Sequence, residues 1–208
     1  MMGWGPQTRE TVVDVFDEDA EPFDLKDDSD LDEDADDDLD DDDDYDLEDA
    51  GEDDVDLVVA VYREDGQPQV VPLDYDLAND LDELIRQLSR LPGDSGADGF
   101  VSVAGEFFVI CRVRGRTVDV LLSDAGAAHD WPIARDVIDY LGEEMPDEDD
   151  DAAPVGDLEM FAASGLGSFE LEAIATDYDE DSDVLLAQIA EKLKIGPEFA
   201  TAAASFDG

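Results

Sequence analysis

Two side chains in this sequence could form a nucleophilic pair, because Cys111 is its one cysteine and His129 its one histidine. A thiol beside an imidazole would indicate a small hydrolase or transferase. Cys111, however, alternates with Phe107, Val109 and Val113 along an apolar stretch, and a thiol in such a place is normally buried and unreactive. We therefore keep this chemistry as an alternative interpretation that a buried Cys111 would exclude.

The other patterns that resemble chemical sites are incomplete. With 62 acidic residues, carboxylates will lie close together by chance, so no catalytic carboxylate pair can be assigned. Residues 177–183 begin like a calcium-binding EF-hand loop, but Ser182 replaces the required glycine and Gln188 the final glutamate. Residues 165–167 lack the third glycine of a dinucleotide loop. We predict no catalytic residue, no metal site and no cofactor.

Arg112, Arg114 and Arg116 form the one cluster of basic residues. In an acidic domain they would form ion pairs with nearby carboxylates, or they would form an anion-contacting patch at the end of a sheet. Trp131 precedes Pro132 at a predicted helix start, where a tryptophan either packs on the helix or serves as an exposed anchor. We retain these three arginines and Trp131 as candidate interaction residues.

The charge of the chain limits its partners. Acidic residues number 62 and basic residues 11, which gives a net charge of -51, while the hydrophobic content of 43% is ordinary. Residues 14–54 carry 26 acidic residues and one basic residue, Lys26. Such a charge disfavours binding to nucleic acid and to anionic membranes, and it favours a basic protein partner.

The sequence shows neither a membrane-spanning helix nor a signal peptide. No apolar run approaches the ~18 residues of a membrane-spanning helix, and residues 1–10 lack the basic and apolar regions of a signal peptide. A single cysteine fits a reducing compartment. We expect a cytoplasmic protein that does not contact membranes.

The elements that would position these residues predict an α+β fold, in which about five mostly antiparallel strands pack against helices and a three-helix module follows. Strands are predicted at 57–62, 69–73, 100–104, 106–113 and 116–122. The domain organisation that we expect is a disordered acidic tail at 1–54, a sheet domain at 55–142, an acidic linker at 143–154, a helical module at 155–199 and a C-terminal tail at 200–208.

Helix signals fall between and after these strands. Leucines recur with helical spacing from Leu77 to Leu91, and Asp76 is a plausible N-cap. Pro132 and Gly142 are placed to begin and end a second helix. In the C-terminal module three helical stripes are predicted, which comprise Leu158 and Phe161, then Leu166, Phe169, Ile174 and Tyr178, then Val184, Leu185, Ile189 and Leu193. Between sheet and module, Ser123 and Asp124 are expected to cap a helix.

From residue 55 to about 199 the chain resembles an actinobacterial family of tRNA adenosine deaminase-associated proteins. The most specific matching stretches are Leu-Leu-Ser-Asp-Ala at 121–125 and Gly-Asp-Leu at 156–158, which includes Asp157. Weaker matches occur at 57–63, 106–109 and 187–193. We interpret Ser123, Asp124 and Asp157 as signatures of the fold.

What the resemblance implies is an association with the wobble-adenosine deaminase, mainly through gene neighbourhood, with no activity attached. The sequence lacks the His-x-Glu and Pro-Cys-x-x-Cys zinc signature of the deaminase itself. We therefore expect a non-catalytic acidic accessory protein that binds a basic surface on the deaminase or on another RNA-handling protein. The alternatives are an enzyme that uses Cys111 and His129, and a structural or solubilising protein without a dedicated partner.

Overall fold

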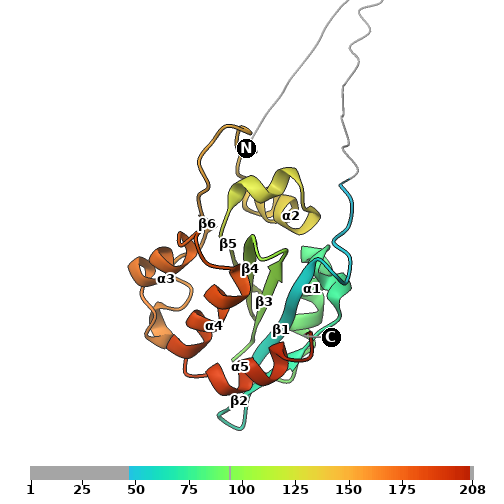
Figure 1. The fold of residues 1–208 in the computed structure, drawn as a ribbon. Helices are drawn as coiled ribbons and strands as arrows, with labels where there is room; N and C mark the ends of the chain where they lie inside the picture. The colour runs from blue at the N-terminus through green and yellow to red at the C-terminus, as the bar shows by residue number, and fades with distance from the viewer. Residues whose placement is uncertain (1–46, 94, 207–208) are drawn as a thin grey trace, which may run out of the picture. The chain divides into compact units, whose positions relative to one another are not determined.

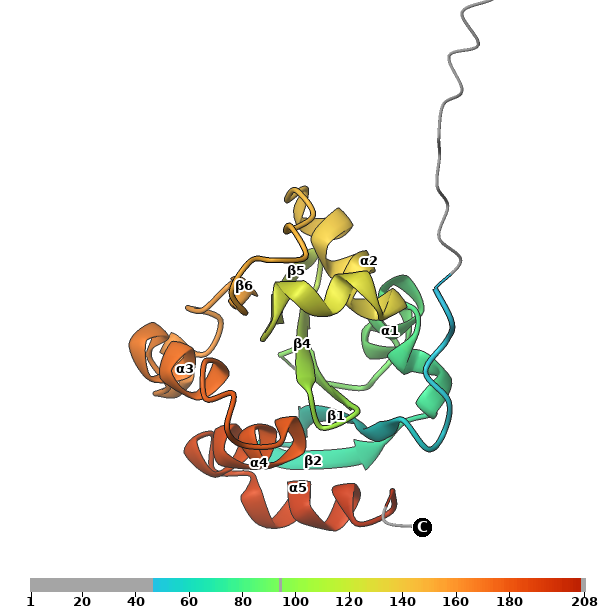
Figure 2. The same cartoon turned by 45° about the horizontal axis from the view of Figure 1, so that its top comes forward.

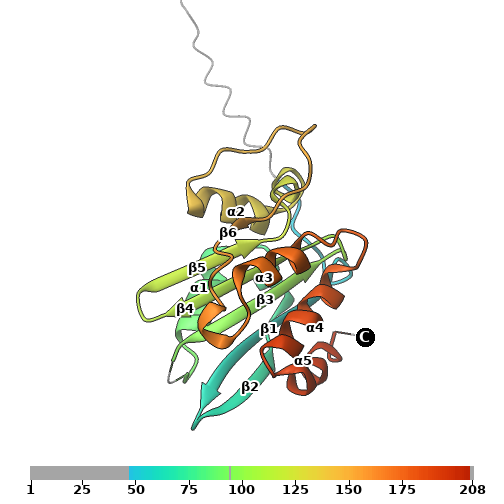
Figure 3. The ribbon, with the colours of Figure 1, turned by 90° about the vertical axis from the view of Figure 1, so that its left-hand side faces the viewer.

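The computed structural model describes residues 47–93 and 95–206. Six strands form one sheet in the order β2-β1-β3-β4-β5-β6, and every neighbouring pair is antiparallel (Figure 3). The strands are β1 Val55–Glu64, β2 Gln67–Pro72, β3 Ala97–Val103, β4 Phe107–Arg114, β5 Thr117–Leu122 and β6 Val155–Gly156. The sheet confirms the predicted α+β class, with the two-residue strand β6 in addition to the five strands that we expected.

Helices cover both faces of this sheet (Figures 1 and 2). The α-helices are α1 Leu81–Ser89, α2 Pro132–Leu141, α3 Ser168–Ala175, α4 Ser182–Lys192 and α5 Gly196–Ala203. Short 3-10 helices lie at η1 Tyr75–Ala78, η2 Ala125–His129 and η3 Ala162–Ser164. Within the described residues, each helix is too short or too polar to traverse a bilayer.

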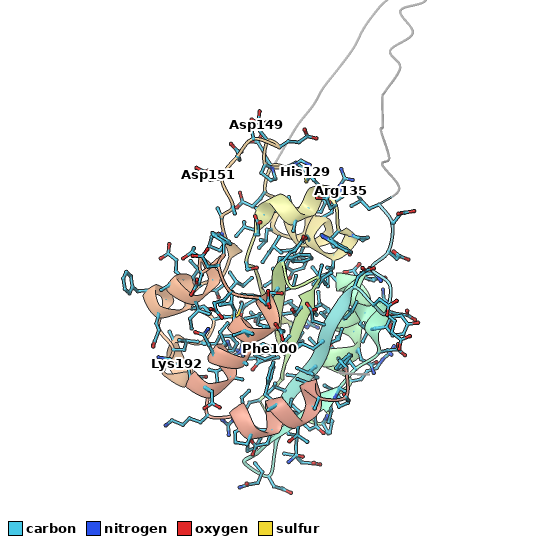
Figure 4. The ribbon with its side chains drawn as sticks, in the orientation of Figure 1. Phe100, His129, Arg135, Asp149, Asp151 and Lys192 are labelled. Carbon is cyan, nitrogen blue, oxygen red and sulfur yellow. The ribbon has the colours of Figure 1, made fainter. Side chains whose placement is uncertain are left out.

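Two hydrophobic cores follow from the alternation of side chains along the strands. Val58 and Val109 face the core shared with α1 and α2, whereas Val59 and Ile110 face the core shared with α3, α4 and α5. Phe100 stands at the centre of the second core (Figure 4), where its ring stacks on Phe161 at 6.1 Å between centroids and meets Phe199 edge-on at 5.8 Å. Because both faces are covered, the central strands are almost continuously apolar.

The start of α1 corrects one prediction. The helix begins at Leu81, and its N-cap is Asp80, whose carboxylate accepts a hydrogen bond from the Glu83 N–H at 2.7 Å. Asp76 lies in the separate 3-10 helix η1. The sequence pattern hid this break because Leu77 and Leu81 are four residues apart and both are buried.

The domain begins earlier than position 54. Ala50 is buried, and the Asn79 side chain bonds its backbone twice, since Oδ1 accepts from the Ala50 N–H at 2.7 Å and Nδ2 donates to its carbonyl at 3.0 Å. Residues 50–54 therefore belong to the folded unit, not to a disordered tail. The predicted disorder of residues 1–46 lies outside the described residues.

Ser123 and Asp124 have different roles, which corrects the prediction that both cap a helix. Asp124 does cap η2, because its Oδ1 accepts from the Gly126 N–H at 2.9 Å. The buried Ser123 instead accepts a hydrogen bond from the Phe108 N–H of β4 at 2.9 Å. Ser123 therefore serves the sheet.

The Gly-Asp-Leu stretch forms the sheet edge. Gly156 has a φ of 113°, and a Cβ there would lie 2.2 Å from the Val120 carbonyl oxygen. The Asp157 N–H donates to that same carbonyl at 2.8 Å. A side chain at position 156 is thus incompatible with the pairing of β6 and β5. The glycine of the Gly-Asp-Leu stretch is therefore required by the sheet edge.

The helical module departs from the predicted stripes at both ends. Residues 158–161 form no α-helix, while α5 continues to Ala203 and buries Phe199 and Ala202 against the sheet. Phe169, which we placed on an apolar stripe, is 85% exposed. The periodicity therefore located the helices of the module better than it located their buried faces.

Candidate functional site

A row of charged side chains crosses the sheet on the face that the C-terminal helices cover. Arg112 of β4 pairs in register with Asp98 of β3 on one side and with Asp119 of β5 on the other. The Arg112 Nε atom lies 2.9 Å from Asp98 Oδ1, and Arg114 Nη2 lies 3.5 Å from Asp119 Oδ2. Two of the three clustered arginines therefore form ion pairs with carboxylates of neighbouring strands.

Arg112 is enclosed by its surroundings. Its side chain is 13% exposed, and its guanidinium carbon lies 4.7 Å from the centroid of the Phe161 ring. Its Nη1 donates to the Met160 carbonyl, which also accepts from Arg114 Nη2 at 3.4 Å. The two arginines thus connect β4 to the segment that leads into η3.

The buried pair is incompletely satisfied. The Nε–H of Arg112 does not point at the Asp98 oxygen and has no hydrogen-bond partner among the described residues. Burial raises the pKa of Asp98 from 3.8 to about 6, although Arg112, Arg114 and Arg63 oppose the rise. Burial also lowers the pKa of Arg112, against the attraction of Asp98. Both directions mean that the two charges lose more from dehydration than their attraction returns.

A pocket of about 90 Å³ opens beside this pair, between the end of the sheet and the C-terminal module. Its polar lining consists of Tyr62, Arg63, Ser95, Asp98, Arg112 and Ser164. A pocket of this volume has room for several water molecules or for a small polar group. The structure therefore assembles two arginines, one carboxylate and several hydroxyl groups around a space for a small polar ligand.

Cys111 and His129 have other surroundings. Cys111 is fully buried in the core under α1 and α2, and burial raises the pKa of its thiol to about 12, so it carries no thiolate at neutral pH. His129 Nε2 lies 2.9 Å from the Pro146 carbonyl oxygen, at the base of the loop that carries Asp149 and Asp151 (Figure 4). The buried thiol excludes the nucleophilic pair that we had kept as an alternative.

The remaining sequence candidates do not join the pocket. Arg116 lies in the exposed turn after β4 and makes no ion pair with any described residue. Trp131 is half-buried directly before α2, and its ring centroid lies 6.2 Å from that of Phe107. Across the described part of the chain, no group of three or more His, Cys, Asp or Glu side chains could hold a metal ion.

Asp98 was missed because the predicted strand began at residue 100. The sequence could have placed Asp98 in this strand, since it alternates with Phe100 and Ser102 on one face of β3. A charged residue in phase with a buried phenylalanine indicates either a strand end or a buried ion pair. Here it is both.

The described part of the domain carries a large excess of acidic residues. Positions 47–93 and 95–206 contain 38 acidic residues against nine basic ones. Only Glu83, Asp98, Asp119 and Glu170 form ion pairs there. The acidic loop above His129, residues 147–151, consists entirely of aspartate and glutamate. Most carboxylates of this domain therefore remain available to an external cation.

By its fold this is an α+β protein, with helices on both faces of an antiparallel sheet. The chain belongs to the Rv3753c-like tRNA adenosine deaminase-associated protein family, whose model matches residues 56–196. Protein Rv3753c of Mycobacterium tuberculosis (strain ATCC 25618 / H37Rv) is 36% identical over 138 residues, which cover 65% of this chain and 80% of that relative. The resemblance found in the sequence is thereby confirmed. No solved structure matches the chain.

Proposed function

We propose that this protein is a non-catalytic, cytoplasmic accessory protein that binds a basic protein surface, with tRNA adenosine deaminase as the partner. The observation that carries the proposal is the excess of carboxylates without a basic neighbour: 38 acidic residues meet nine basic ones in the described domain, and only four of the carboxylates form ion pairs there. The name of the family supplies the candidate partner.

Electrostatics explains how such a protein would act. A surface that binds tRNA needs lysine and arginine to contact phosphates. An acidic domain is attracted to that same surface, and the attraction accelerates the encounter at low salt. Residues 14–54, with 26 acidic residues and one basic residue, add a second polyanion. The accessory protein and tRNA would then compete for the deaminase.

The burial of the candidate nucleophile Cys111 supports a non-catalytic role. The thiol of Cys111 is fully buried and protonated at neutral pH.

The test is a binding measurement between the full-length protein and purified tRNA adenosine deaminase from the same cells. Association and dissociation rates are recorded at about 50 mM and 200 mM salt, with and without competing tRNA. We expect the association rate to fall steeply with salt and tRNA to displace the protein. Absence of binding at low salt would sink the proposal and leave the structural or solubilising alternative.

A truncated variant measures the contribution of the acidic N-terminal run to binding of the deaminase. A chain without residues 1–46 retains Ala50 and its contacts to Asn79. It should associate more slowly than the full chain and show a weaker salt dependence, because fewer charges steer the encounter. If rate and salt response are unchanged, the run plays no part in binding, and the folded domain alone carries the interaction.

A further inference from the structure

The pocket beside Asp98 brings several arginines together in this acidic domain. Arg63 and Arg112 line it, and Arg114 lies close enough to influence Asp98. Among the described residues, Asp98 is the acidic side chain that lines the pocket, and Asp119 of β5 acts on Asp98 from nearby. Basic side chains therefore outnumber acidic ones locally, although the described domain carries 38 acidic and nine basic residues. The accessory role proposed above does not use this feature.

The arginines of the pocket differ in what they already bind. Arg112 is enclosed by Asp98, Phe161 and the Met160 carbonyl. Arg63 is exposed at the end of β1, and it forms no ion pair with another described residue. The hydroxyl groups of Tyr62, Ser95 and Ser164 complete the polar lining. Guanidinium and hydroxyl groups are the donors that carboxylates and phosphates accept from.

We propose that this pocket binds a small oxyanion, a carboxylate or a phosphate-type group, and that Asp98 takes up one proton from solvent as the anion enters. The proton converts the Asp98 carboxylate into a hydroxyl donor, which can bond the ligand instead of repelling it. One bond forms, between the proton and the Asp98 oxygen, and the protein gains one positive charge to offset the charge of the ligand.

The surroundings of Asp98 make this proton uptake feasible. The charged groups that face it are Arg112 and Arg114 of β4, Arg63 of β1 and Asp119 of β5. The C-terminal module contributes only uncharged walls, which are Phe161, Ser164, Leu193 and Ile195. With a pKa of about 6, about one Asp98 in ten is already protonated at pH 7. Protonation of Asp98 weakens its ion pair with Arg112 but breaks no hydrogen bond between described residues, because the Nε–H of Arg112 does not point at the carboxyl oxygen 2.9 Å away.

The test is a titration of the full-length protein with acetate and, separately, with sulfate, at pH 6, 7 and 8. The two probes separate a planar carboxylate site from a tetrahedral, phosphate-type site. NMR signals of the arginine Nε–H groups report on Arg63 and Arg112 directly. We expect a saturable shift for at least one probe, with an apparent affinity that falls about tenfold from pH 7 to pH 8 because the competent fraction falls tenfold.

Three variants make the site specific. Arg63→Gln should weaken binding at least about tenfold, whereas Arg116→Gln, with the same change of charge outside the pocket, should leave it unchanged. Asp98→Asn should bind the probe equally well at all three pH values. The proposal is overturned if neither anion gives a saturable shift at pH 6, if wild-type affinity is independent of pH, or if Arg116→Gln weakens binding as much as Arg63→Gln.

Discussion

Replacing Asp98 with asparagine should stabilise the protein at neutral and alkaline pH. Asp98 is 17% exposed, and burial raises its pKa from 3.8 to about 6. The folded protein therefore holds this proton over a range in which the unfolded chain has released it. Stability from the protonated form is complete below about pH 4 and is lost as pH rises through about 6.

The size of the effect follows from the shift. A shift of about 2 pKa units corresponds to about 3 kcal/mol in the free energy of unfolding. Asparagine stays neutral and approximates the protonated carboxyl. The variant should therefore match the wild type near pH 4 and exceed its stability by up to about 3 kcal/mol at pH 7 to 8.

Urea unfolding followed by far-UV circular dichroism at several pH values measures this difference. The whole chain, at a net charge of -51, also loses stability through general repulsion as pH rises, so a control is needed. Glu180→Gln removes one exposed negative charge outside the pocket and should give a small difference that barely changes with pH. If Asp98→Asn is less stable than the wild type at pH 8, the Arg112 ion pair outweighs the dehydration of the carboxylate and our reasoning is wrong.

Three further predictions concern the rest of the fold. Ser123→Ala leaves the buried Phe108 N–H without its acceptor and should cost about 1–3 kcal/mol of unfolding free energy in the same urea assay; an unchanged midpoint would contradict the assigned role. Asn79→Ala removes both hydrogen bonds to Ala50, so amide exchange at residues 50–55 should accelerate while the core strands keep their protection. Cys111, with a pKa of about 12 and no exposure, should react with thiol reagents at pH 8 only as fast as the protein unfolds; rapid labelling of the native protein would refute its burial.

The ends of helix α2 and the central strands could be predicted from the sequence, because each is determined by residues close together in the chain. Pro132 is the first residue of α2, and Gly142 ends that helix in the left-handed conformation with φ of 69°, as both residue types predicted. The apolar runs located the central strands because burial on both faces removes polar positions from them.

The pocket could not be predicted because it depends on contacts between distant segments. Arg112 meets the carbonyl of Met160 and the ring of Phe161, almost 50 residues further along the chain. Nothing in the local pattern around Arg112 indicates that this strand end will be covered. Whether a strand end is solvent-exposed or buried depends on the path that the chain takes after the last strand of the sheet.

The order of the layers along the chain has a consequence during synthesis on the ribosome. All strands except the short β6 precede residue 123, but the helices that cover Phe100 and Ile110 are encoded between 168 and 203. At about 5–20 residues per second, the last of these helices emerges several seconds or more after the sheet. Throughout that interval one apolar face of the nascent sheet has no cover. The acidic run at 14–54 has left the ribosome by then, and its charge repels other nascent chains of the same kind while the cover is still being made.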